Sequence, residues 1–282
     1  MRARISEKNI FPNFDLFSEY RKIEILLSET HVIGHLDRYG KRLSPYFSIE
    51  QFLNDYSFLD WNLRGTFIST EEMRIGLGIE KRRFSNKTIN KDLVLDFIQY
   101  AVNCTCRVKS TIKSYSAYIE KDITDVLYGN MNALLTRLGA SFSIDDDTPE
   151  VFVVYDDDLS SVVANSCPEI RVSLTEYQKI DNRGDLIRKS EILCTLFKRL
   201  EPIRKKFQGT EYAQLCDDTT FLFNKAGIRH SEGNSEIDKK FAKMPPDELE
   251  KWYDRTYQLF LSCMVISQYL DEKPDIALIK KV

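Results

Sequence analysis

The chain has 282 residues, of which 43% are hydrophobic and 29% are charged, proportions typical of a globular protein rather than a disordered one. Its 40 basic and 43 acidic residues leave a net charge of −3, which excludes a globally basic nucleic-acid-binding protein and leaves only local patches for such a partner. We expect no membrane partner, because no apolar run approaches the roughly 18 to 20 residues of a membrane span.

The six cysteines favour a cytoplasmic protein with free thiols. Only two of them are close in sequence, as C-x-C, and the first 14 residues are charged and broken by Pro12, unlike a secretory leader.

The N-terminal part of the chain predicts a helical domain. Residues 14–34 space their apolar side chains as a helix with one buried face. A second helix is expected after the N-cap Ser48, with Gln51 in the capping-box position. A third, short helix is expected after Ser69 or Thr70.

Two longer helices follow. Residues 91–119 step their apolar side chains by three or four after the N-cap Asn90, which predicts one long amphipathic helix. Residues 122–138 predict another, ended by Gly139 in a left-handed C-terminal cap.

The pattern then changes to short runs rich in β-branched and aromatic residues. "SFSI" and "EVFVVY", separated by the turn signal "DDDTP", predict a β-hairpin, and "IRVSLTEY" is a candidate third strand.

Helical periodicity returns at Asp185. One helix should end near Pro202, a second should end at Gly227, and a third should begin at the N-cap Asp247 with Glu250 in its capping box. These three amphipathic segments predict an antiparallel helical bundle, followed by an exposed tail after Pro274.

The expected fold class is therefore mainly α: a helical N-terminal region, a small β-rich hairpin insertion and a C-terminal antiparallel helical bundle. The predicted division is 1–138 for the N-terminal domain, 139–184 for the β-rich connector, 185–273 for the bundle and 274–282 for the tail.

We expect no metal and no cofactor. Two Asp triplets, at 145–147 and 156–158, lack the alternating spacing of a calcium loop, and solvated turns explain them better. His31 and His35 lack the glutamate and third ligand of a zinc helix. No Walker-type loop and no complete dinucleotide fingerprint is present.

Two basic clusters are candidate contacts for a phosphate backbone, although such runs are more often solvated faces. The candidate nucleic-acid-binding residues are Lys81, Arg82, Arg83, Lys87, Arg204 and Lys205.

The segment "FNKAGIRHSEGN" carries the candidate catalytic residues. His230 can exchange protons near neutral pH, Arg229 can hold a phosphate, and Asn224 can orient either group, which is chemistry sufficient to cleave RNA without a metal. The alternative is structural, because cations after Gly227 also cap the last carbonyls of a helix.

The pattern N-K-x-G-x-x-H-x-x-G before a final amphipathic helix resembles the C-terminal helices of HEPN domains, helical bundles of toxin ribonucleases and bacterial abortive-infection (phage-defence) proteins. In that family an arginine and a polar residue precede the histidine. Asn224 matches the polar position and His230 the histidine, but the arginine position falls on Phe223.

The resemblance covers residues 185–270 and implies metal-independent binding or cleavage of RNA at a homodimer interface built by the bundle. His230 would be the general acid or base, Arg229 the phosphate clamp and Asn224 the orienting residue. The alternative function is a non-catalytic helical interaction or regulatory protein, in which "GIRH" is only a helix end.

Overall fold

The structure is a computed structural model that describes residues 15–85, 87–144, 150–228 and 240–280. It is mainly helical, as predicted, with two small two-stranded sheets. The chain divides into two compact units, Met1–Val153 and Val154–Val282. Residues 139–184, expected as a separate connector, are shared between the two units.

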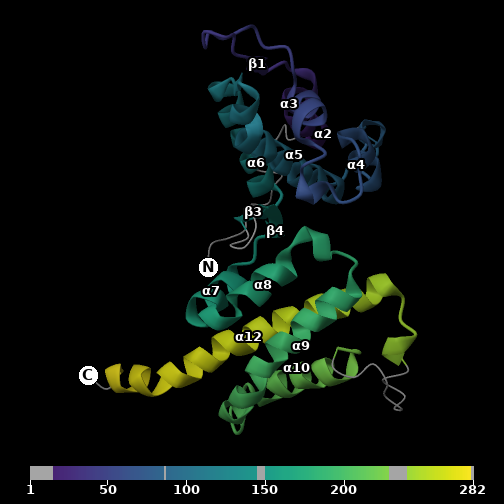
Figure 1. Cartoon of the computed structure of the whole chain (residues 1–282). Coiled ribbons are helices and arrows are strands. Elements are labelled where there is room, and N and C mark those ends of the chain that lie inside the picture. The colour runs from purple at the N-terminus through teal and green to yellow at the C-terminus, as the bar shows by residue number, and fades with distance from the viewer. Residues whose placement is uncertain (1–14, 86, 145–149, 229–239, 281–282) are drawn as a thin grey trace. The chain divides into compact units, whose positions relative to one another are not determined.

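The first unit is a helical cluster around α5 (Figure 1). Its helices and helical turns are α2 (Leu16–Glu24), η1 (Ile25–Glu29), α3 (Ile49–Phe52), η2 (Leu53–Ser57), η3 (Asn62–Arg64), α4 (Thr70–Gly76), η4 (Lys81–Arg83), α5 (Lys91–Thr111), η5 (Ile112–Tyr115) and α6 (Lys121–Arg137). Its strands are β1 (Ile33–His35), β2 (Ala117–Ile119) and β3 (Ala140–Ile144), and β3 pairs with β4 (Val151–Tyr155).

Local signals set the beginnings of these helices. The Ser48 hydroxyl and the Gln51 side chain form the predicted capping box of α3. Ser69 caps α4 and Asn90 caps α5 through their side-chain oxygens. Gly139, with φ of 64°, turns the chain after α6 as predicted.

Two predicted helices of this unit are too long. The first ends at Glu29, and the residues after it form β1, which pairs antiparallel with β2. The long helix ends at Thr111 rather than at residue 119, because Ala117–Ile119 supply β2. His35 therefore lies on a strand, where its ring nitrogens contact the Tyr115 carbonyl and the Tyr56 hydroxyl, each at 3.2 Å.

The second unit is a helical bundle. Its elements are α7 (Asp158–Ser166), η6 (Pro168–Ile170), α8 (Arg171–Gln178), η7 (Ile180–Asn182), α9 (Leu186–Ile203), η8 (Arg204–Phe207), α10 (Ala213–Lys225) and α12 (Pro246–Ile279). Figure 1 shows α9 and α10 lying along α12, and both helices contact it. Leu196, Phe197, Phe223, Phe260 and Leu261 lie in its core.

Three details of this unit differ from the predictions. The expected third strand is the helix α8, whose Leu174 and Tyr177 pack into the bundle core. The last helix begins at Pro246 without a side-chain cap, so Asp247 is not its N-cap. It also continues through Pro274 to Ile279, although this last part is mostly exposed.

No helix in the described ranges is both long enough and apolar enough to cross a lipid bilayer.

Candidate functional site

The candidate catalytic segment follows the end of α10. Asn224 lies in the last turn of this helix and is partly exposed. Gly227 then adopts a φ of 75°, a left-handed conformation that glycine accepts most easily, and Ile228 is buried again. The Cys194 thiol on α9 donates a hydrogen bond to the Ile228 carbonyl at 2.7 Å. Arg229 and His230 lie outside the described residues.

Phe223, at the position where the HEPN pattern carries an arginine, is a core residue. It is fully buried, with its ring centroid 4.8 Å from that of Phe197 and 6.3 Å from that of Phe260. A side chain at this position packs inside the bundle, where an arginine would need a buried partner for its charge. Any guanidinium that acts with His230 must therefore come from another residue.

A buried lysine joins the beginning of α9 to α12. The Lys189 ammonium lies 2.8 Å from Glu250 Oε1 and 2.8 Å from Asp254 Oδ1. The Tyr177 hydroxyl donates to the same Asp254 oxygen at 2.9 Å, and the Gly184 amide donates to Glu250 at 2.8 Å. Glu250, predicted as a capping residue, thus bonds to a distant turn instead.

The electrostatics of Glu250 fit this structural role. Burial opposes its negative charge, but the Gly184 amide and the Lys189 ammonium outweigh burial and hold the pKa of the carboxyl below its ordinary value. Both carboxylates of this cluster bind the Lys189 ammonium, so the cluster links α9 to α12.

The basic residues of the second unit are partly neutralised. Arg204 lies 3.8 Å from Asp217, and both side chains are exposed. Lys205 is exposed in η8. Exposed ion pairs are weak and screened by salt, so these side chains stay accessible to a phosphate.

The basic loop of the first unit is directed largely at its own carboxylates. Lys81 lies 3.1 Å from Glu24, and Arg82 lies 3.3 Å from Glu80. Arg83 donates to the Gly78 carbonyl at 2.9 Å. Lys87 is exposed beyond this turn. The loop is therefore a weaker candidate for a phosphate backbone than its sequence indicates.

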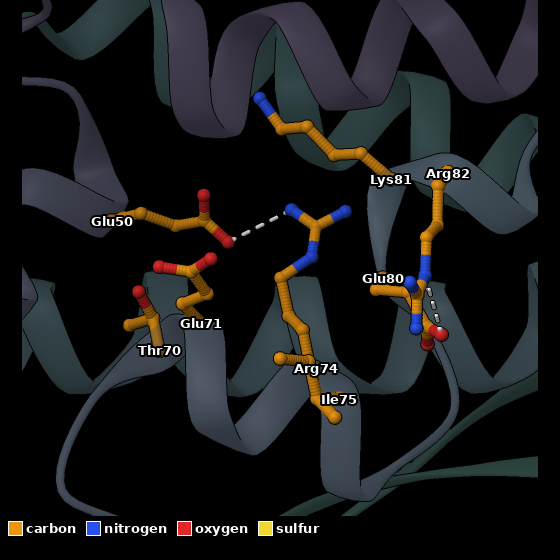
Figure 2. Close-up of a pocket in the computed structure, with 8 residues that line it drawn as sticks. All are labelled: Glu50, Thr70, Glu71, Arg74, Ile75, Glu80, Lys81 and Arg82. Carbon is orange, nitrogen blue, oxygen red and sulfur yellow. Dashed lines mark hydrogen bonds and ion pairs between the residues drawn. The ribbon is translucent and has the colours of Figure 1, made fainter.

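A pocket of about 470 Å³ lies beside this loop, between α3, α4 and η4 (Figure 2). Charged side chains of both signs dominate its lining. The lining residues are Glu50, Thr70, Glu71, Arg74, Ile75, Glu80, Lys81 and Arg82.

Arg74 is the centre of this site. Its side chain is only 5% exposed, and its guanidinium binds both oxygens of Glu24, at 3.1 and 2.8 Å, and Glu50 Oε1 at 3.0 Å. Its Nε donates to the Ile79 carbonyl at 3.3 Å. The cation also lies over the Phe97 ring, with 5.3 Å between the guanidinium carbon and the ring centroid.

Hydroxyl groups complete this buried network. The Tyr20 and Ser28 hydroxyls donate to Glu24, at 3.0 and 2.7 Å, and the Tyr100 hydroxyl donates to Glu50 Oε1 at 2.7 Å. Burial raises the pKa of Tyr100 well above its ordinary value, with the charge of Glu50 adding to the effect, so this group is a stable donor. For Glu24, burial acts against the carboxylate, but bonding to Arg74 outweighs it and lowers the pKa.

No motif in the sequence predicts a site at Arg74, Glu24 or Glu50. The available signal was a charged residue on a helix face that otherwise carries apolar or aromatic side chains, as with Glu24, which lies one helical turn from both Tyr20 and Leu27. A buried charge at such a position requires a partner, but the spacing does not say which residue supplies it.

The described residues contain no group of three His, Cys, Asp or Glu side chains arranged to hold a metal ion. Asp157 and its neighbours lie at the start of α7, where the Asp157 side chain caps the helix. The other triplet, at 145–147, lies outside the described residues.

The chain matches no protein-family model, no curated protein and no solved structure.

Proposed function

We propose that the second unit is a HEPN-like module that binds RNA and cleaves it without a metal, with Asn224, Arg229 and His230 as its functional residues. In this proposal His230 is the general base or acid for the proton of the ribose 2′-hydroxyl, and Arg229 holds the phosphate. Asn224 orients the phosphate or the imidazole ring. Cytoplasmic localisation belongs to the same proposal.

The observation that supports this proposal is the way α10 ends. Asn224 is partly exposed on the last helical turn, and four residues later Ile228 is buried and bonded to Cys194 on the neighbouring helix. Ile228 precedes Arg229 in the sequence, so the described part of this segment ends at an anchored residue. Such anchoring is what a site built on a loop needs for defined geometry.

A homodimer is part of the proposal, because the resembling family builds its site from two subunits. Light scattering after size-exclusion chromatography should then give twice the 32.9 kDa mass of one chain. A monomer at the concentrations that support activity would contradict the shared site.

Phe223 favours a second candidate function, a non-catalytic helical interaction or regulatory protein. The complete burial of this residue removes the family arginine from the site and makes the position part of the core. In this alternative the segment after Gly227 only ends a helix.

Metal-free RNA cleavage separates the two candidates. Purified protein is incubated with a mixed-sequence RNA in excess EDTA, as wild type, His230→Ala and the control His31→Ala, which changes an exposed histidine of the first unit. The proposal expects cleavage by wild type and control, and a loss of at least about 100-fold in His230→Ala, because general acid-base catalysis contributes roughly 10² to 10⁴.

The outcomes are distinct. Equal cleavage by wild type and His230→Ala would refute the role of His230. If all three proteins bind RNA and none cleaves it, only the RNA-binding half of the proposal remains. No binding and no cleavage would favour the interaction protein.

A further inference from the structure

We propose that the loop 36–42 of the first unit binds single-stranded nucleic acid, through its cations and an exposed tyrosine ring. This surface is separate from the RNA site proposed for the second unit, and the proposal stands whether or not that unit cleaves RNA. Its evidence is an ordered backbone, a set of unpaired cations and an aromatic ring open to a base, all within one short loop.

Hydrogen bonds hold the backbone of this loop. The loop follows β1, and an antiparallel bridge between Leu36 and Arg42 closes it. The Asp37 carboxylate accepts the backbone amides of Tyr39 and Lys41, at 2.8 and 2.9 Å. The side chains of the loop are therefore presented from an ordered turn, which lowers the entropic cost of binding a ligand.

In the part of the chain that the structure describes, the cations of this loop have no acidic partner. Arg38, Lys41 and Arg42 are exposed, and none of them forms an ion pair or a side-chain hydrogen bond there. Asp37 is the one carboxylate in the loop sequence, and it bonds to the backbone of the turn. The basic residues 81–83, in contrast, contact carboxylates or a carbonyl of their own unit. The cations of the loop 36–42 thus remain available to phosphate groups.

Both arginines of the loop lie against tyrosine rings. The Cζ atom of Arg38 is 4.7 Å from the centroid of the Tyr39 ring, and that of Arg42 is 4.8 Å from the centroid of the Tyr118 ring on β2. Tyr39 is 78% exposed, so its ring is accessible to a base. Aromatic rings and guanidinium planes stack on unpaired bases, which a single strand offers and an intact duplex does not. The loop therefore suits a single strand.

An anionic lipid surface is the main competing partner for a loop of this charge. Binding to such a surface buries apolar side chains among the headgroups in addition to attracting cations. The loop has one aliphatic side chain, Leu36, which is partly buried, and Leu43 beyond it is a single exposed residue. This composition favours nucleic acid over lipid.

The test measures fluorescence anisotropy of a labelled 2′-O-methyl oligouridylate of about 12 nucleotides, titrated with the full chain. This probe is not cleaved through its 2′-oxygen, so ribonuclease activity does not affect the result. We expect saturable binding that Tyr39→Ala weakens at least about five-fold, the equivalent of roughly 1 kcal/mol of base stacking. Tyr39→Phe keeps the ring and should bind as wild type does. The exposure of Tyr39 means that both variants should fold.

The contribution of charge is tested with Arg42→Gln. Arg82→Gln is the matched control, because it removes a guanidinium that is 82% exposed in the same unit but is paired with Glu80. Each phosphate contact with a single strand contributes about 0.7 to the slope of log K against log salt concentration. Arg42→Gln should reduce the slope by about this amount, whereas Arg82→Gln should leave it unchanged.

A DNA probe identifies the kind of strand. An oligodeoxythymidylate of the same length replaces the RNA analogue in the titration. Binding of either probe that depends on Tyr39 supports the proposal, and the tighter of the two assigns the sugar.

Any of the following results would overturn the proposal. These are no binding of either oligonucleotide, binding that Tyr39→Ala leaves unchanged, an equal change of slope in Arg42→Gln and Arg82→Gln, and tighter binding of a duplex than of a single strand. Binding of phosphatidylserine vesicles through Tyr39, with no binding of oligonucleotides, would make the loop a lipid-binding surface instead.

Discussion

The first unit has an arginine and two glutamates inside its core, whereas the second unit has an apolar core and places its paired lysine at one end of the bundle. Arg74 and Glu24 are almost fully buried, with side chains 5% and 0% exposed. Around Lys189, Asp254 remains 51% exposed. We therefore expect the stability of the first unit to fall most when a buried charge is removed. The stability of the second unit should fall most when a charge is introduced into its core.

The largest effect is expected when a charge enters the apolar core. Phe223→Arg would introduce the arginine that the proposed HEPN resemblance lacks, but it would remove a buried ring and bury a guanidinium. We expect the second unit to lose more than the roughly 3 to 5 kcal/mol of a Phe→Ala change. Hydrogen exchange of α9 amides measures this unit within the full chain. Phe221→Arg, which replaces a 44% exposed ring two residues earlier on the same helix, is the control and should change little. A folded, active Phe223→Arg protein would show that the position faces the site.

The next effect is loss of the buried cation. Arg74→Met removes the buried cation from both Glu24 and Glu50 and leaves only the half-exposed Lys81 beside Glu24, so the first unit should lose about 3 to 5 kcal/mol. Exchange of α5 amides reports this loss, and Arg82→Met, at an 82% exposed side chain, should stay within about 0.5 kcal/mol. Equal effects of the two substitutions would contradict the central role of Arg74.

A smaller loss is expected at the end of the bundle. Lys189→Met removes the partner of Glu250 and Asp254, but water reaches Asp254 and replaces part of the interaction. We expect the second unit to lose about 1 to 3 kcal/mol. A loss as large as that of Arg74→Met would mean that the two clusters are equally buried in solution.

The smallest effect is a difference in pH dependence. Because the pKa of Glu24 is lowered on folding, its contribution is complete above the ordinary value of 4.5 and is lost as the pH falls through the folded value. The stability of the first unit should therefore fall more steeply below about pH 4.5 in wild type than in Glu24→Gln. One such group changes the slope by at most about 1.4 kcal/mol per pH unit. Identical slopes in the two proteins would contradict the lowered pKa.

Local signals predicted much of the fold. Asn90, Ser48 and Gly139 act within three or four residues of themselves, so the sequence is sufficient to locate them. The segment "IRVSLTEY" misled because its β-branched residues favour a strand, whereas Leu174 and Tyr177, three residues apart, form the buried face of a helix. Tertiary packing decided between the two.

The pocket depends on contacts that no local pattern reveals. Arg74 joins Glu24, which is 50 residues away, and Glu50, which is 24 residues away. The adjacent Lys81, Arg82 and Arg83 are visible as a basic cluster in the sequence, whereas the distant partners of a charged residue are not. The candidate RNA site could be predicted from the sequence, because Asn224, Arg229 and His230 lie within seven residues of one another.

A hydrogen-exchange footprint with bound RNA tests the proposed function most directly, because it locates the RNA without requiring cleavage. With a non-cleavable 2′-deoxy-substituted RNA, the account predicts slower exchange in the segment from Asn224 to Met244, and unchanged exchange in η4 and the first turn of α5. Slower exchange confined to residues 81–93, with none after Gly227, would contradict it and move the nucleic-acid site to the first unit.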